Sequence, residues 1–439
     1  MRLLSVVLFS LATLAGGAVL AWQLLGDDQR VFQPGALSYA HHQLELACAS
    51  CHDDAFSGNA AIEQRCLGCH QADMKAIGDA HGPKKFADPR NASELQVLDA
   101  SRCLSCHREH VPEQTLAMQV TQPKDFCMAC HGDIASVRPS HQAVAGDSCT
   151  NSGCHNYHDN STLYEAFLSA HMHEPALLEH PQKRPRHVAV APALTADWSS
   201  LWSQPDDLPA IEKAEQAWTQ SAHAKGHANC SDCHRSDNPK DVPITVCADC
   251  HEDEWQALQK GHHGMRLAVG LAPMTVAEAK LPMHADAADN ALTCNSCHAP
   301  HRYDTATAAA ESCLGCHADE HSNNWLQSAH GQRWQQDPLT GVSCAGCHMP
   351  REPHPDNSSQ WVQHNQSANL RPNDKMLKQV CMRCHGLEFA LSALADPALI
   401  ERNFTGPASG RHDSMAWLRQ QAGRNAAPAI TPAAEHRQQ

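Results

Sequence analysis

The sequence is poor in the side chains that usually fill a protein interior. Aromatic residues make up only 5% of its 439 residues, and tyrosine occurs only 4 times. The mean hydropathy of −0.47 is that of a polar chain. Folding depends chiefly on the burial of apolar surface, so a large core of aliphatic and aromatic side chains is excluded as the main architecture.

An excess of positive charge is also missing. The chain has 33 Lys and Arg against 48 Asp and Glu, a formal net charge of −15. A polyanion would be repelled, so nucleic acid is not an expected ligand. The acidic surface suits the docking of small partner proteins with basic patches, and it serves equally well to keep the chain soluble.

No cysteine is left over from one repeated pattern. In Cys48-Ala-Ser-Cys51-His52 two cysteines stand two residues apart and a histidine follows at once. Ten motifs have this form, and an eleventh, Cys149-Thr-Asn-Ser-Gly-Cys154-His155, is stretched. The other nine cysteine pairs are Cys66 and Cys69, Cys103 and Cys106, Cys127 and Cys130, Cys230 and Cys233, Cys247 and Cys250, Cys294 and Cys297, Cys313 and Cys316, Cys344 and Cys347, and Cys381 and Cys384. Together the motifs use all 22 cysteines of the chain.

The histidine in every motif decides between the possible meanings of the cysteine pairs. Zinc ribbons also use such pairs but do not require a histidine directly after each one, and a disulfide framework explains only the even count. In an exported chain the pattern is typical of covalent c-type haem, with both thiols bound to the porphyrin and the histidine bound to the iron. We therefore predict eleven haem c groups. Their proximal iron ligands are His52, His70, His107, His131, His155, His234, His251, His298, His317, His348 and His385.

Haem also explains how a polar chain can fold. The motif region offers roughly 31 residues per haem, far fewer than an ordinary domain. We expect porphyrins to replace the missing core, which gives a mainly α fold with extensive coil, two haem-packed domains and little or no β-sheet. Without haem we expect no stable fold.

The N-terminal residues 1–26 predict export. Arg2 precedes an apolar run from Leu3 to Leu25, which is long enough to span a bilayer. A cleavable signal peptide ending at Ala21 is the alternative, but the apolar run continues beyond that site. We favour an uncleaved anchor in the cytoplasmic membrane with the bulk of the protein in the periplasm.

Motif spacing divides the rest of the chain. Residues 38–160 hold five motifs and residues 210–420 hold six. Between them, residues 161–209 lack cysteine and are rich in proline, which predicts a linker. The Ala- and Pro-rich residues 421–439 predict a disordered tail.

Histidine is abundant enough to give every iron a second ligand. The chain has 33 histidines, so 22 remain after the proximal ligands are assigned. The best distal candidates are His42, His81, His110, His141, His158, His171, His223, His262, His301, His330 and His364, with His41, His263, His284, His321 and His354 as close competitors. Some follow a motif histidine by three residues, as in His107-Arg-Glu-His110, which places both on one face of a helical turn. Others end a repeated Trp-x-x-Ser-x-His segment, seen at Trp218 and Trp325.

Two resemblances follow from these motifs. Residues 38–160 resemble the class III multihaem cytochromes, which implies bis-histidine irons in a small haem-packed unit. Residues 210–390, with Cys347-His348-Met349-Pro350 and the Trp-x-x-Ser-x-His segments, resemble the family of pentahaem nitrite reductases, hydroxylamine oxidoreductases and octahaem tetrathionate reductases. The chain has no C-x-x-C-Lys motif and no tyrosine after Tyr303, so this resemblance implies haem stacking without the catalytic motifs.

The sequence favours an electron conduit in anaerobic or alternative respiration. Its partners would be a quinol-oxidising membrane cytochrome, a terminal reductase or an outer-membrane cytochrome. The alternative is a reductase of nitrite, hydroxylamine or a sulfur oxyanion with one open haem site in the C-terminal domain, because metal catalysis needs an open coordination position. A haem filament is a third hypothesis.

Overall fold

The computed structural model describes residues 2–25, 32–54, 57–77, 81–142, 144–150, 155–159, 163–182, 194–202, 204–235, 242–338, 340–354, 360–370 and 374–425. In this part of the chain the regular structure is mostly short helices joined by turns and coil. The strands β1 (Arg351–Pro353) and β2 (Gln360–Val362) form a two-stranded antiparallel sheet, in which Glu352 is the register partner of Trp361. The prediction of a mainly α fold with extensive coil is therefore confirmed.

Most of the helices are only one or two turns long. The helices up to the middle of the chain are α1 (Arg2–Leu25), α2 (Asn59–Ile77), α3 (Pro83–Phe86), α4 (Ala92–Val97), α5 (Cys103–Cys106), α6 (Met128–His131), α7 (Ile134–Val137) and α8 (Glu165–His171). The later helices are α9 (Leu208–Thr219), α10 (Ala222–Lys225), α11 (Cys230–Cys233), α12 (Ile244–Ala248), α13 (Glu252–Gln259), α14 (Met265–Ala268), α15 (Cys294–Cys297), α16 (Thr305–Leu314), α17 (Glu320–Trp325), α18 (Ala329–Gln336), α19 (Cys344–His348), α20 (Asp374–Gln379), α21 (Leu387–Leu394), α22 (Pro397–Glu401) and α23 (Asp413–Asn425).

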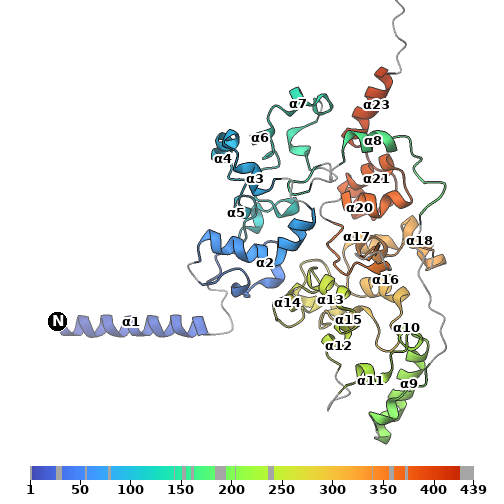
Figure 1. The fold of residues 1–439 in the computed structure, drawn as a ribbon. Coiled ribbons are helices and arrows are strands. Elements are labelled where there is room, and N and C mark those ends of the chain that lie inside the picture. The colour runs from blue at the N-terminus through green and yellow to red at the C-terminus, as the bar shows by residue number, and fades with distance from the viewer. Residues whose placement is uncertain are drawn as a thin grey trace, which may run out of the picture.

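Two groups of helices lie side by side. Figure 1 shows α2 to α7 on one side and α9 to α22 stacked along the other. We call residues 32–159 the N-terminal section and residues 204–425 the C-terminal section. We propose that these sections correspond to the predicted five-haem domain, residues 38–160, and six-haem domain, residues 210–420.

Among the residues that the structure describes, conventional hydrophobic cores occur only in part of the molecule. The larger cluster centres on Leu377, Leu387, Leu391 and Met415, which are fully buried. Leu168 of α8 packs into it, so this helix, which lies within the predicted linker, joins the C-terminal section. The proline-rich residues 183–193 and most of the predicted tail lie outside the described residues. Of the residues described, none between 32 and 159 belongs to either hydrophobic cluster.

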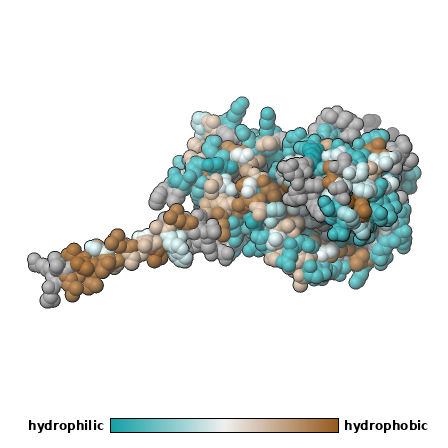
Figure 2. Space-filling model, turned by 90° about the horizontal axis from the view of Figure 1, so that it is seen from below, coloured by the Kyte–Doolittle hydropathy of each residue, from teal (hydrophilic) through white to brown (hydrophobic). Residues whose placement is uncertain are grey.

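Helix α1 projects from the rest of the molecule. Its stretch Leu4–Gln23 has a mean hydropathy of 2.1, and none of it is buried. Figure 2 shows it as a hydrophobic rod beside a largely hydrophilic body. By length and composition α1 could cross a membrane, and a signal sequence would have the same properties.

Candidate haem sites

Each motif folds into a short turn that gathers its reactive side chains. The amide of the motif histidine donates to the carbonyl of the first cysteine, as in His107 to Cys103 at 2.8 Å and His385 to Cys381 at 2.8 Å. The stretched motif keeps this bond, from His155 to Cys149 at 3.0 Å, although Cys154 lies outside the described residues. A shared turn thus presents thiol and imidazole groups together, as attachment to one porphyrin requires.

Every motif histidine faces a second histidine ring across a gap. The facing pairs, with the distances between ring centres, are His52 with His110 (6.4 Å), His70 with His41 (6.0 Å), His107 with His158 (6.3 Å), His131 with His81 (6.2 Å), His155 with His141 (5.9 Å), His234 with His301 (5.9 Å), His251 with His223 (5.9 Å), His298 with His364 (6.3 Å), His317 with His263 (6.1 Å), His348 with His321 (6.2 Å) and His385 with His330 (6.1 Å). Two imidazole nitrogens bound to one metal at about 2 Å each place their ring centres about 6 Å apart. The spacing therefore fits one iron between each pair.

Eight of the expected distal histidines stand opposite a motif histidine, and three do not. His41 faces His70 in place of its neighbour His42, and His263 faces His317 in place of its neighbour His262. His171 hydrogen-bonds Glu174 at 2.6 Å instead. The ring opposite His348 is that of His321, which its hydrogen bond to the Ile400 carbonyl holds in place. From the sequence, His41, His263 and His321 are close alternatives for the distal iron ligands.

The repeated Trp-x-x-Ser-x-His segments have a common structural basis. Trp218 and Trp325 are buried, and each lies at or beside the end of a helix, α9 or α17. The serine three residues later caps the next helix, since Ser328 Oγ accepts from Gly331 N at 3.1 Å and Ser221 Oγ accepts from Ala224 N at 3.2 Å. The histidine is then the second residue of that new helix, so the repeat places His223 and His330 alike.

The helical turn expected for His107 and His110 is not formed. His107 has an extended backbone, and His110 has a φ of 66° in the left-handed region. His301 repeats this conformation with the same φ of 66°. Such a backbone is uncommon for residues with a side chain and persists only where the surroundings enforce it. A motif histidine and the histidine three residues later therefore face different partners. His107 faces His158, and His110 faces His52.

Hydrogen bonds fix the orientation of many of these rings. The Nδ1 atoms of His107, His110 and His364 donate to backbone carbonyls at 2.9, 2.8 and 2.8 Å. A carbonyl can only accept, so the proton stays on Nδ1 and Nε2 keeps its lone pair for a metal. Burial lowers the pKa of His263, His298 and His348 to about 4, which keeps them neutral at pH 7.

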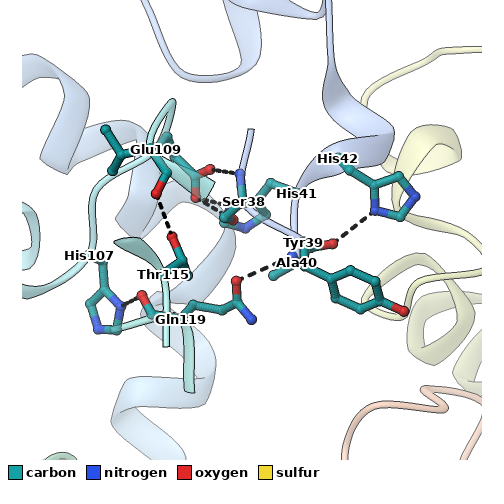
Figure 3. Close-up of polar contacts among 10 residues, drawn as sticks. Ser38, Tyr39, Ala40, His41, His42, His107, Glu109, Thr115 and Gln119 are labelled. Atoms are coloured by element: carbon teal, nitrogen blue, oxygen red, sulfur yellow. Dashed lines mark hydrogen bonds and ion pairs between the residues drawn. The ribbon is translucent and has the colours of Figure 1, made fainter. Parts of the chain in front are cut away.

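A carboxylate orients the ring of His41. Figure 3 shows His41 directed at Glu109, with 2.6 Å between His41 Nδ1 and Glu109 Oε1. Ser38 also donates to this carboxylate, through its amide at 2.7 Å and its hydroxyl at 2.9 Å. Burial alone would raise the pKa of Glu109, but these hydrogen bonds outweigh burial and lower the pKa to about 2. Glu109 is therefore ionised, and its negative charge makes the His41 imidazole a more basic ligand for a metal.

Replacing this carboxylate tests its influence. In Glu109→Gln the negative charge beside His41 is lost, so the ferric state of the haem attached at His70 is less stabilised. We expect its reduction potential to rise by about 60 mV, the one-electron equivalent of a tenfold change in an equilibrium constant. Spectroelectrochemical titration measures the shift. Glu113→Gln, which removes the same charge at an exposed position nearby, should leave every potential unchanged.

The motifs are also arranged in rows. Thiols of successive motifs lie close enough to shift each other's pKa at Cys127 with Cys149, Cys247 with Cys294, and Cys313 with Cys344. The other successive thiols lie within electrostatic range, at Cys51 with Cys69, Cys66 with Cys103, Cys106 with Cys127, Cys233 with Cys247, Cys297 with Cys313, and Cys347 with Cys384. Each section therefore holds its motifs in a row that follows the chain.

A continuous cavity of about 4480 Å³ runs along both rows, and every motif contributes at least one cysteine to its lining. Shared among eleven motifs, this is on the order of 400 Å³ each, which is within the range of a single ligand pocket. The cavity, the thiols and the paired imidazoles together fit covalently attached, bis-histidine haem.

Comparison with known proteins supports this class for the N-terminal section. Residues 40–132 match the family model described as cytochrome c3, and the matched segment ends one residue after His131. The match supports a multihaem electron-transfer cytochrome with covalent c-type haem, although it covers only about a fifth of the chain. No curated protein and no solved structure matches the chain. The comparisons give no match that supports the resemblance predicted for residues 210–390.

Proposed function

We propose that the protein is an undecahaem c-type cytochrome that carries electrons along two rows of bis-histidine haems. The observation that supports this best is the facing of all eleven motif histidines by a second histidine at 5.9 to 6.4 Å. The distal ligands are then His41, His81, His110, His141, His158, His223, His263, His301, His321, His330 and His364. The haems supply one-electron redox chemistry, and the chain supplies attachment, axial ligands and exclusion of water.

This ligand arrangement favours electron transfer over the reductase alternative. A substrate must reach an open coordination position on the metal. Paired imidazoles would leave a bound iron no open position for substrate, so sites of this kind would exchange electrons without binding substrate. In the C-terminal section, too, a second histidine faces each motif histidine. This is the section in which the reductase alternative requires a haem with an open coordination position.

We place the protein in the periplasm, anchored to the cytoplasmic membrane through residues 3–25. The exposed apolar helix α1 supports this placement, and c-type haem is attached outside the cytoplasm. A quinol-oxidising membrane cytochrome on one side and a terminal reductase or outer-membrane cytochrome on the other are the proposed partners. The acidic net charge of −15 suits partners with basic patches.

Intact mass and EPR of the purified protein test the proposal together. We expect the mass of the chain plus eleven haems, with residues 3–25 retained, and only low-spin ferric signals. A mass with fewer haems would contradict the count, and a chain starting at Trp22 would contradict the anchor. A high-spin signal of one haem per protein would favour the reductase.

A further inference from the structure

One contact between the two sections lies around His262. The side-chain amide of Gln43 donates to the backbone carbonyl of His262. The rings of His42 and His262 are stacked with 6.5 Å between their centres and 27° between their planes. Tyr39 packs against both rings, at 5.7 Å from His42 and 5.6 Å from His262. The short 3-10 helix η2 (His42–Leu44) thus packs against the C-terminal section at α14.

This contact is partly buried. His42 is 9% exposed and Gln43 is 4% exposed, whereas Tyr39 at its edge is 44% exposed. The Nδ1 of His42 donates to the carbonyl of Tyr39 at 2.8 Å, which fixes the orientation of the His42 ring. Figure 3 shows His41 and His42 pointing in opposite directions, with Tyr39 and His42 on the side of the C-terminal section.

Each ring of the contact is adjacent in sequence to an expected iron ligand. His42 follows His41, which faces His70. His262 precedes His263, which faces His317. The contact therefore joins the second motif of the N-terminal row to the fourth motif of the C-terminal row. A single row in chain order would instead join the motif of His155 to that of His234. Figure 1 shows α11, which carries the Cys230 motif, at the opposite end of the view from α7, the last helix before the His155 motif.

We propose that Tyr39, His42, Gln43 and His262 form the crossing point through which the two rows exchange electrons. With haem bound, a single electron would pass between the site held by His41 and His70 and the site held by His263 and His317, and no atom or proton would be transferred. Electron tunnelling weakens exponentially with distance, so a direct contact between residues adjacent to the ligands offers a short route. The rows are then joined at interior positions, which leaves four free ends. This inference rests on the proposed function.

The crossing is measured in full-length protein that carries a marked electron acceptor. His330→Met converts the site of His385, at the far end of the C-terminal row, to His/Met ligation, which raises its potential and changes its spectrum. Pulse radiolysis with less than one electron per molecule reduces haems in both sections. Electrons from the C-terminal row should reach the marked site in a fast phase, and those from the N-terminal row should arrive in a slow phase.

Variants of the contact should slow only the slow phase. In this background we expect Tyr39→Leu and His262→Leu to slow it several-fold. Tyr39→Phe keeps the ring and should retain the rate. Tyr164→Leu and His173→Leu make matching changes at exposed positions and should have no effect. Potentials and low-spin spectra of the haems at His70 and His317 should stay unchanged, which separates lost coupling from altered ligation.

The outcomes distinguish the crossing point from the proposed function. An unchanged slow phase in Tyr39→Leu and His262→Leu overturns the crossing point. Equal slowing of both phases also overturns it, because it indicates a general structural effect. If electrons fail to reach the marked site in either phase, although mass spectrometry shows all haems attached, the proposed function itself fails.

Discussion

Without attached haem, the exported chain is expected to lose its cooperative unfolding transition. The haem sites account for a cavity of about 4480 Å³. Without haem the largely apolar lining of this cavity would be exposed to water. The burial of apolar surface that stabilises the fold would then be lost, and net stability is small enough for such a loss to unfold the chain.

The loss of structure in the haem-free chain should differ between the N-terminal and C-terminal sections. The cluster of Leu377, Leu387, Leu391 and Met415 is the largest conventional core among the described residues. Chain produced in cells that lack the haem-attachment machinery should therefore keep weak hydrogen-exchange protection in α20 to α23 and none in residues 38–159. Thermal circular dichroism and exchange mass spectrometry check this, with the haem-loaded protein as the control. A sharp melting transition of the haem-free chain would contradict the prediction.

The local parts of the haem sites could be predicted from the sequence because their geometry depends on neighbouring residues. Two cysteines and a histidine within five residues form one turn wherever they occur, so the spacing alone indicates the site. The Trp-x-x-Ser-x-His repeat is local in the same sense, because Ser221 and Ser328 begin a new helix and so fix the position of the following histidine.

The partners across each gap could not be predicted in the same way, because they depend on tertiary packing. His41 and His42 are adjacent, and only the docking of Glu109 on one side and of His262 on the other decides which ring faces His70. Likewise, α8 lies in a proline-rich region, but Leu168 packs against apolar side chains that are more than 200 residues away in the sequence. The spacing of residues in sequence contains no signal for either contact.

Adjacent histidines provide the sharpest test of these assignments. In His263→Ala the haem attached at His317 should lose its sixth ligand, whereas in His262→Ala all eleven haems should stay six-coordinate. The ferrous His263→Ala protein is expected to bind one molecule of carbon monoxide, and the ferric protein should gain a high-spin EPR signal of one haem. The His262→Ala protein should bind none and show only low-spin signals. Absorbance titration with carbon monoxide measures the stoichiometry.

Two further pairs extend the comparison to both sections. His41→Ala is expected to open the site of His70 while His42→Ala leaves it closed, and His321→Ala should open the site of His348 while His171→Ala does not. The physical reason is the same in each pair, since only the first histidine stands about 6 Å from a motif histidine. Carbon monoxide binding in His42→Ala, His171→Ala or His262→Ala would show that the ligands are exchanged relative to the structure. Binding in neither member of a pair would mean that another side chain binds that iron as a strong sixth ligand.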